Sequence, residues 1–232
     1  MFNGRHFDRS VVLLCLRRYL AYNLSLRDLE EIMAERGIHI DHSTIHRWIV
    51  HFAPLLRERF NRRKRLVTGK WHVDETDVRV RGRWMYLYRA FDSADETVEF
   101  FFSEKRNLPA AKLFIRNAPK RHGRPNNIVI DGSQMNREAI IAWDGESRLR
   151  DQSQRLLKPI RIRQSQYPNN PIEQDHRRVK RRIRSMLGFK SITCATMILC
   201  GIEMLHMVRK RQASYTLNRT PSLIEQFEIL AA

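Results

Sequence analysis

The hydrophobic pattern divides the chain into a helical first part and a later part that mixes strands and helices. Over the first 60 residues, apolar side chains recur at the three- and four-residue spacing of buried helix faces. Ser25 and Asp28 have the spacing of a capping box at the start of a second helix, and Gly37 is a natural stop for it. Asp41 or Ser43 can cap a third helix. Two short helices joined around a glycine are typical of a helix-turn-helix.

The start of the third helix would read DNA in such a motif. Its early polar residues are expected to face the major groove, and these are His42, Thr44, His46 and Arg47. A plain three-helix bundle without DNA contacts has the same periodicity, so the pattern leaves that alternative open. The basic run over residues 57–65 is predicted to be a linker along phosphates, with a boundary near residue 66.

From residue 71 the pattern changes to that of an α/β domain. The expected strands cover residues 71–80, 83–92, 98–102, 127–130 and 158–163. The expected helices cover residues 109–117, 136–142, 171–186 and 192–210. The strand over 127–130 is apolar after Asn127, as in the buried centre of a sheet.

Charge indicates the class of partner. Lys and Arg number 43 against 25 Asp and Glu, which gives a net charge of +18 and favours a polyanion such as nucleic acid. Residues 67–104 carry a net charge of −3, whereas residues 105–211 carry +16. Three cysteines without a CxxC pair argue against a secreted disulfide scaffold. The longest uncharged stretch, residues 192–202, is about half of the roughly 20 residues that a membrane span needs, so we expect a cytoplasmic, nucleoid-associated protein.

Three carboxylates stand where they could hold metal ions. Asp74 lies within a strand, Asp131 ends the apolar strand, and Glu173 is in the first turn of the helix over 171–186. Carboxylates so placed can hold two divalent cations for phosphodiester chemistry. Each has an ordinary alternative, since Asp131 could start a turn and Glu173 could favour a helix N-terminus. Asp74 also competes with Glu75 and Asp77, and physical reasoning does not choose among the three.

The helix over 171–186 also suggests a grip on DNA. At 100° per residue, one stripe carries Glu173 followed by Arg177, Lys180 and Arg184. An acid at the helix start and bases along its face allow one helix to ligate metal and to contact phosphates beside it. An ordinary amphipathic surface helix is the alternative, and it leaves the density of basic residues unexplained.

Five sequence blocks, in order over nearly the whole chain, resemble the DDE transposases of the bacterial insertion-sequence family six. The blocks are GRHFDRS, DHSTIHRWI, WHVDETDVRVRGRWMYLYRAFD, YPNNPIEQDHRRVKRRI and LGFKS. The resemblance implies a ribonuclease-H-like catalytic domain, with a mixed five-stranded sheet and flanking helices, behind a small helix-turn-helix domain. It implies Asp74, Asp131 and Glu173 as the metal-binding triad, and so favours Asp74 over its neighbours. Lys180 matches the basic residue that the family has seven positions after the glutamate.

The resemblance also implies the function and the division of the chain. Residues 1–66 would read the terminal inverted repeats of the element, residues 67–212 would nick and join DNA, and residues 213–232 would form a tail. The implied cofactors are two Mg²⁺ ions, for which Mn²⁺ substitutes. The implied partners are double-stranded element ends and target DNA, with at least a dimer to bring two ends together and no membrane.

Two departures from the family and two other functions complete the sequence-based expectations. Gly132, Ser133 and Gln134 stand where many relatives have Lys, and the 42 positions from Asp131 to Glu173 predict an enlarged loop over residues 143–155. A helix-turn-helix regulator without catalysis, or an inactive transposase-derived DNA-binding protein, is the main alternative. An RNA-binding protein is disfavoured, because RNA-recognition aromatic motifs are absent from the sequence.

Overall fold

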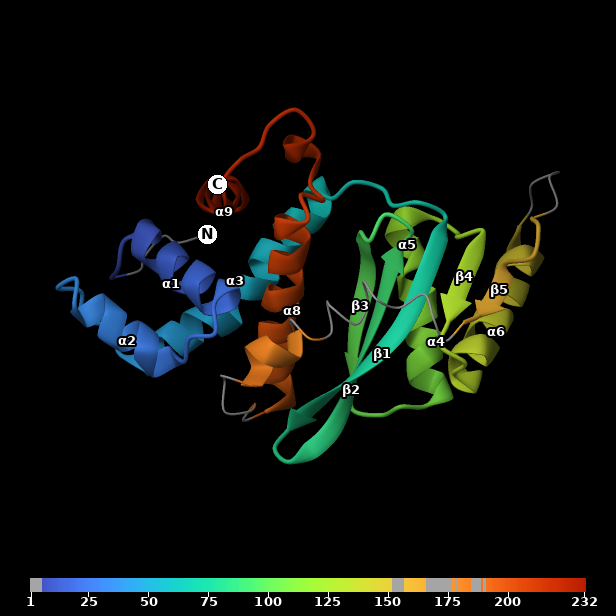
Figure 1. Ribbon diagram of the computed structural model, residues 1–232, viewed down its shortest axis with the longest axis horizontal. Helices are drawn as coiled ribbons and strands as arrows, with labels where there is room; N and C mark the ends of the chain where they lie inside the picture. Colours follow the sequence, from blue (N-terminus) through green and yellow to red (C-terminus); the bar gives the residue numbers. More distant parts are fainter. Residues whose placement is uncertain (1–5, 152–156, 166–176, 178, 185–188, 190) are drawn as a thin grey trace. The chain divides into compact units, whose positions relative to one another are not determined.

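The computed structural model describes residues 6–151, 157–165, 177, 179–184, 189 and 191–232 (Figure 1). By packing, the chain forms two compact units, one from Met1–Arg65 together with Arg178–Ala232 and one from Leu66–Arg177. The predicted division at residues 66 and 212 was made along the sequence and stays a prediction. The two units are taken one at a time below.

The helical unit joins both ends of the chain. Its helices are α1 (Arg9–Ala21), α2 (Leu26–Ala34), α3 (His42–Arg63), α8 (Ile192–Arg209), the short 3₁₀ helix η1 (Ser214–Thr216) and α9 (Leu223–Ala231). The predicted capping box of α2 is confirmed, because Ser25 and Asp28 exchange side-chain bonds with each other's backbone N–H. Asp41, and not Ser43, caps α3 by accepting a bond from the Ser43 N–H. Gly37 adopts a φ of +72°, which suits glycine at a helix stop.

Helix α3 is longer than the sequence predicted. Residues 57–63, which were expected to belong to a basic linker over residues 57–65, are helical, and the expected phosphate contacts stay a prediction. The helix continues past Pro54 to Arg63 because Leu56 and Phe60 extend the buried stripe that Phe52 begins. Arg59 donates a hydrogen bond to the carbonyl of Leu230 at 3.2 Å. At least this arginine therefore serves internal packing.

Helix α8 is the centre of the helical unit. Gly201 lets it approach its neighbours closely, since a Cβ there would lie 2.9 Å from the Cβ of Ala53 and 2.8 Å from Cδ2 of Leu20. By length and composition α8 could also cross a membrane, but 67% of it is buried inside the protein. Such burial is typical of a core helix.

The second unit is built on a mixed five-stranded sheet. Its strands are β1 (Lys70–Val80), β2 (Arg83–Asp92), β3 (Thr97–Ser103), β4 (Asn127–Ile130) and β5 (Arg161–Gln164). Its helices are α4 (Leu108–Asn117), α5 (Pro119–His122) and α6 (Gln134–Arg150). The spatial order is β3-β2-β1-β4-β5, with β1 antiparallel to β2, β2 antiparallel to β3, and β4 parallel to both β1 and β5. This is the ribonuclease-H-like arrangement that the family resemblance implied.

Successive side chains of β1 point to opposite faces of the sheet, one of which packs into the apolar core. Trp71 and Val73 point into the core, which they share with Phe114 of α4 and Ile140 of α6. In a regular strand the next residue, Asp74, points to the opposite face of the sheet. The apolar core thus fixes which side of the sheet Asp74 occupies.

Helix α6 corrects the expectation of an enlarged loop after Asp131. The predicted helix over 136–142 continues to Arg150, so residues 143–150 are helical. Trp143 packs against the sheet core, and the buried carboxylate of Asp144 pairs with Arg124 and Arg148. Part of the added length between Asp131 and Glu173 is therefore helix. The apolar pattern after residue 142 did not predict this extension.

Candidate active site

Asp74 and Asp131 lie side by side at the carboxyl end of β4. The parallel register of β1 and β4 pairs Val73 with Ile130, so the next residue of each strand is one of the two aspartates. Burial raises the pKa of Asp74 to about 6, and the negative charge of Asp131 contributes to the rise. The N–H of Glu75, which donates to Oδ1 of Asp74 at 2.7 Å, opposes the shift. Two carboxylates that are close enough to repel each other form a suitable binding site for a cation.

The turn after Asp131 is built by the residues that depart from the family pattern. Gly132 has a φ of +98°, a backbone conformation that residues with a side chain rarely adopt. The N–H of Ser133 donates to Oδ1 of Asp131 at 3.3 Å, and Ser133 caps α6 through a bond from the N–H of Asn136 at 3.4 Å. Helix α6 begins at Gln134. The Gly132-Ser133-Gln134 sequence thus makes a tight turn from the strand into the helix.

Glu75 belongs to a different polar cluster from Asp74. Its Oε1 accepts a bond from Nδ2 of Asn136 at 2.9 Å, and its Oε2 lies 2.7 Å from Nε of Arg106. Only 5% of the Glu75 side chain is exposed. Burial raises its pKa, and the charge of Arg106 opposes that rise. The sequence did not decide which of three acids on β1 could bind metal. Of these, Glu75 already pairs with Asn136 of α6 and with Arg106.

Arg89 is a residue near the site that the sequence reading missed. It pairs directly with Asp74 in the register of β1 and β2, and its side chain is fully buried. Its guanidinium carbon lies 4.5 Å from the ring centre of Phe91, and its positive charge lowers the pKa of Asp74. An arginine within the otherwise apolar and aromatic run over 84–91 was the available signal.

The third member of the predicted triad, Glu173, lies outside the described residues. The basic residues of the same predicted helix are described in part. Arg177, Lys180 and Arg184 are helical and exposed. They remain candidates for phosphate contacts.

Arg182 has a structural role instead. Its side chain is buried, its Nε donates to the carbonyl of Tyr19 at 2.8 Å, and its guanidinium lies over the Tyr19 ring. Burial lowers its pKa to about 10. The density of basic residues on this helix therefore includes at least one that packs against α1.

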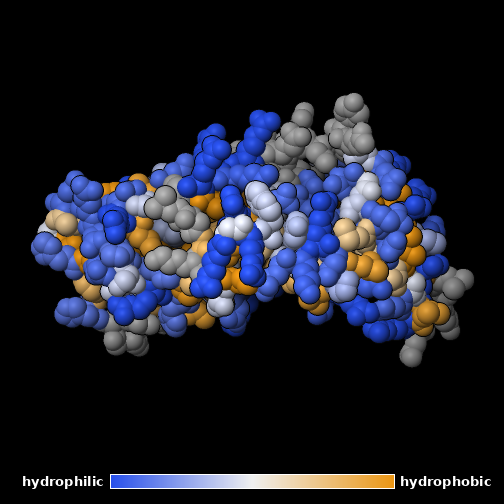
Figure 2. Space-filling view, turned by 90° about the horizontal axis from the view of Figure 1, so that it is seen from below, coloured by the Kyte–Doolittle hydropathy of each residue, from blue (hydrophilic) through white to orange (hydrophobic). Residues whose placement is uncertain are grey.

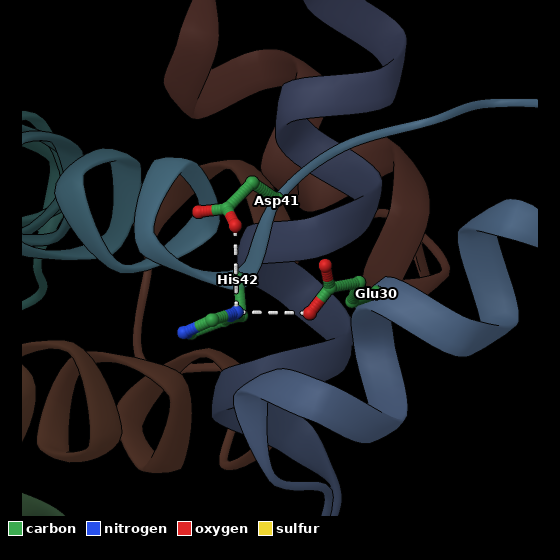
Figure 3. A group of neighbouring side chains, drawn as sticks. All are labelled: Glu30, Asp41 and His42. Carbon is green, nitrogen blue, oxygen red and sulfur yellow. Dashed lines mark hydrogen bonds and ion pairs between the residues drawn. The ribbon is translucent and has the colours of Figure 1, made fainter.

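The predicted DNA-reading residues lie at the start of α3. Nδ1 of His42 is 2.9 Å from Oε2 of Glu30 on α2 (Figure 3). Thr44 accepts a hydrogen bond from Nη2 of Arg47 at 2.8 Å, with Arg47 exposed and His46 half-buried. A role in DNA recognition stays a prediction for all four.

Glu30, Asp41 and His42 also form a possible metal-ligand group. Their ligand atoms lie within 4.8 Å of one another, as Figure 3 shows. However, Asp41 already caps α3 by accepting from the N–H of Ser43 at 2.7 Å, at the positive end of the helix dipole. This group is a hydrogen-bonded contact between α2 and the start of α3.

Comparisons with known proteins agree with this picture. The family model for a DDE domain matches residues 68–212. The transposase for insertion sequence-like element IS431mec of Staphylococcus aureus (strain Mu50) is 32% identical over 215 residues, covering 90% of this chain and 89% of that protein. The transposase for IS257 in transposon Tn4003 of Staphylococcus aureus is 31% identical over the same shares. The HTLV-2 integrase catalytic core in complex with magnesium (trimeric form) gives a TM-score of 0.41 at 14% identity, over 62% of this chain and 88% of that chain.

The mixed sheet and the matched DDE domain define an enzyme class that cuts and joins DNA strands with divalent metal ions. The long match to the two staphylococcal transposases specifies the family further. The chain belongs to the DDE transposases of insertion-sequence family six.

Proposed function

We propose that this transposase binds the terminal inverted repeats of an insertion sequence, nicks the element ends and joins the freed 3′-hydroxyls to target DNA. Asp74, Asp131 and Glu173 would hold two Mg²⁺ ions, for which Mn²⁺ would substitute. The observation that carries the proposal is the adjacency of Asp74 and Asp131 on neighbouring parallel strands.

The residues present fit a divalent cation. The pKa of Asp74 is raised by burial and by the charge of Asp131, so the folded protein disfavours the doubly ionised pair. A cation between the two carboxylates would relieve this repulsion, and carboxylate oxygens are the ligands that Mg²⁺ prefers. When bound, paired divalent ions supply an activated hydroxyl nucleophile and stabilise the leaving oxygen.

The protein's own groups hold and tune these carboxylates. The N–H of Ser133 fixes one oxygen of Asp131, and the N–H of Glu75 fixes one of Asp74. Arg89 holds the pKa of Asp74 lower than burial alone would set it. Asp74 is therefore able to lose its proton near neutral pH and to act as a ligand.

DNA would be gripped by two groups of basic and polar residues. Arg177, Lys180 and Arg184 are exposed and would neutralise phosphates beside the carboxylates. The residues that would read the inverted repeats are His42, Thr44, His46 and Arg47. Because two ends must be joined to one target, the active assembly is at least a dimer. An enzyme that joins DNA works where the DNA lies, so the proposal includes a cytoplasmic, nucleoid-associated location.

A strand-transfer assay tests the proposal. Its substrate is the labelled inverted repeat read from the DNA that flanks the gene, with Mg²⁺ or Mn²⁺ present. Asp131→Asn should abolish joining while leaving specific end binding within a few-fold. Asp77→Asn is the matched control, because Asp77 is an exposed carboxylate on β1, and it should keep activity. Loss of binding together with joining in Asp131→Asn would mean that Asp131 is structural, and would contradict its role.

The same assay distinguishes the alternatives. A regulator or an inactive derivative would bind the ends and form no joined product with either ion. A binder without catalysis would also be indifferent to the Asp131→Asn change.

A further inference from the structure

Strands β1 and β2 continue beyond the rest of the sheet as a two-stranded ribbon. The pairing of β1 with β4 ends at Val73 and Ile130, and the pairing of β2 with β3 ends at Tyr86 and Ser103. Strands β1 and β2 remain paired as far as Val80 and Arg83, and Figure 1 shows their hairpin extending past the sheet. We call residues 79–84 the hairpin tip.

The turn of the hairpin tip is rigid for its size. Arg81 and Gly82 have φ values of +50° and +78°, so both central residues are left-handed, as in a two-residue type I′ turn. Such turns match the natural twist of paired strands. Nε of Arg79 also donates to the carbonyl of Gly82 at 3.3 Å. The tip therefore presents its side chains from a fixed backbone.

The side chains on the tip combine positive charge with an aromatic surface. Arg79, Arg81 and Arg83 are exposed, and Trp84 is 60% exposed. Arg79 and Trp84 are cross-strand partners, with the guanidinium carbon 5.8 Å from the indole ring centre. Charges alone would protect a strand edge from unwanted pairing. Protection of the edge by charge does not explain why the large indole of Trp84 is exposed. An exposed indole indicates a ligand with a flat face.

The location of the tip suits DNA near the cut. Val80 lies six residues beyond Asp74 on β1, which at about 3.3 Å per residue corresponds to roughly 20 Å along the strand. This length equals about six base pairs of duplex. Hydrophilic side chains cover most of the surface that Figure 2 shows, with smaller hydrophobic patches between them.

We propose that the hairpin tip binds unpaired DNA bases beside the site of strand cleavage. The proposal rests on the proposed function, since it places the DNA across Asp74 and Asp131. The three arginines contact phosphates, and the indole of Trp84 stacks on one exposed base. A base presents its flat face to a side chain only when it leaves the duplex stack, and stacking on tryptophan tolerates any sequence. The tip thus holds open the flank of a nicked or distorted end.

Binding measurements with the full-length chain test the stacking. Two probes of equal length are compared, a fully paired element end and the same end with about six unpaired nucleotides at the flank. The wild-type protein should bind the forked probe several-fold more tightly. Trp84→Ala should remove that preference, and Trp84→Phe should keep most of it. Leu149→Ala is the control, because Leu149 is 88% exposed on α6.

A salt titration tests the phosphate contacts. Replacing Arg79, Arg81 and Arg83 together with Gln should reduce the slope of log affinity against log salt by up to about three, since each phosphate contact contributes roughly 0.7–0.9. The control replaces the exposed Arg121 and Arg150 with Gln and should leave the slope within about one of the wild-type value. An unchanged slope in the triple variant overturns the proposal, as does a fork preference that survives Trp84→Ala.

These outcomes separate the hairpin tip from the proposed catalysis. Asp131→Asn should keep the Trp84-dependent preference, because it leaves the tip intact. A wild-type protein that prefers the fork but joins no DNA overturns the catalytic proposal alone. A protein that joins DNA without any Trp84-dependent preference overturns only the role of the tip.

Discussion

The side-chain amide of Asn136 donates a hydrogen bond to Oε1 of Glu75 at 2.9 Å. Glu75 follows Asp74 on β1, and Asn136 lies in the first turn of α6, which begins soon after Asp131. One bond therefore links the strand that bears the first aspartate to the helix that follows the second. The hydroxyl of Ser133, 3.5 Å from the same carboxylate oxygen, lies beside this link. We infer that the hydrogen bond between Asn136 and Glu75 sets the separation of Asp74 and Asp131.

Asn136→Ala should therefore weaken metal binding. Loss of the amide removes one donor from Oε1 of Glu75, whose side chain is only 5% exposed, and this costs roughly 1–3 kcal/mol of folding stability. The Mg²⁺ concentration for half-maximal strand transfer should also rise several-fold, because the aspartates are less well placed. Gln134→Ala, a change at an exposed neighbour on α6, is the control. A lowered melting temperature with an unchanged metal requirement would show a merely structural role.

Asp74→Asn should stabilise the metal-free protein at neutral pH. The pKa of Asp74 is raised from 3.8 to about 6 in the folded state, so the folded protein binds the proton more tightly than the unfolded chain. Wild-type stability therefore falls as the pH rises from about 4 to about 6. Above that window the variant should be more stable by up to about 3 kcal/mol, with the difference disappearing below pH 4. Urea unfolding in a chelator at several pH values measures this.

Divalent cations should reverse that order. Mg²⁺ or Mn²⁺ should raise the melting temperature of the wild-type protein, since a ligand that binds only the folded state stabilises it. Asp74→Asn and Asp131→Asn should respond much less, and a chelator should abolish the wild-type gain. An equal shift in all three proteins would place the cations elsewhere.

Gly201→Ala should loosen the helical unit. The new Cβ would lie 2.9 Å from the Cβ of Ala53, which belongs to α3 and cannot rotate away. We expect a loss of roughly 1–3 kcal/mol in thermal or chemical unfolding. Gly145→Ala in α6 is the matched control, since nothing lies within 4 Å of its added Cβ, and it should be neutral or stabilising. Equal effects of the two changes would contradict the close approach of α8.

Arg182 and Arg184 should separate folding from DNA binding. Arg182→Met removes bonds to the carbonyls of Tyr19 and Leu24, so it should lower the melting temperature. Arg184→Gln changes an exposed residue, so it should leave the melting temperature alone while weakening DNA binding and reducing its salt dependence. Both variants are compared by thermal unfolding and by salt titration of DNA affinity. A lower melting temperature in Arg184→Gln, or weaker DNA binding with an unchanged melting temperature in Arg182→Met, would contradict these roles.

Much of the fold follows from local signals in the sequence. Alternation and turn residues predicted β2 with its observed bounds, and the apolar residues 128–130 predicted β4. Those two elements, with Asp131 at the end of one, were enough to place a candidate carboxylate at a strand end. The capping box at Ser25 was equally local.

The remainder depended on contacts between distant residues. The extension of α3 past Pro54 follows from packing within the helical unit, where Arg59 reaches Leu230. Asp74 could not be distinguished from Glu75 by physical reasoning until Asn136 and Arg106 were seen to occupy Glu75. Arg89 became visible only through its cross-strand pairing with Asp74. Each of these required knowledge of which elements lie together.

The helical unit is interrupted in sequence, and this has a consequence for synthesis. The apolar face of α3 packs with α8, and Arg9 near the first helix pairs with Glu228 in the last. A ribosome therefore releases the first helices long before their packing partners exist, while residues 66–177 emerge in between. A message cut short after the catalytic sheet would yield a protein unable to complete the unit that is expected to recognise element ends.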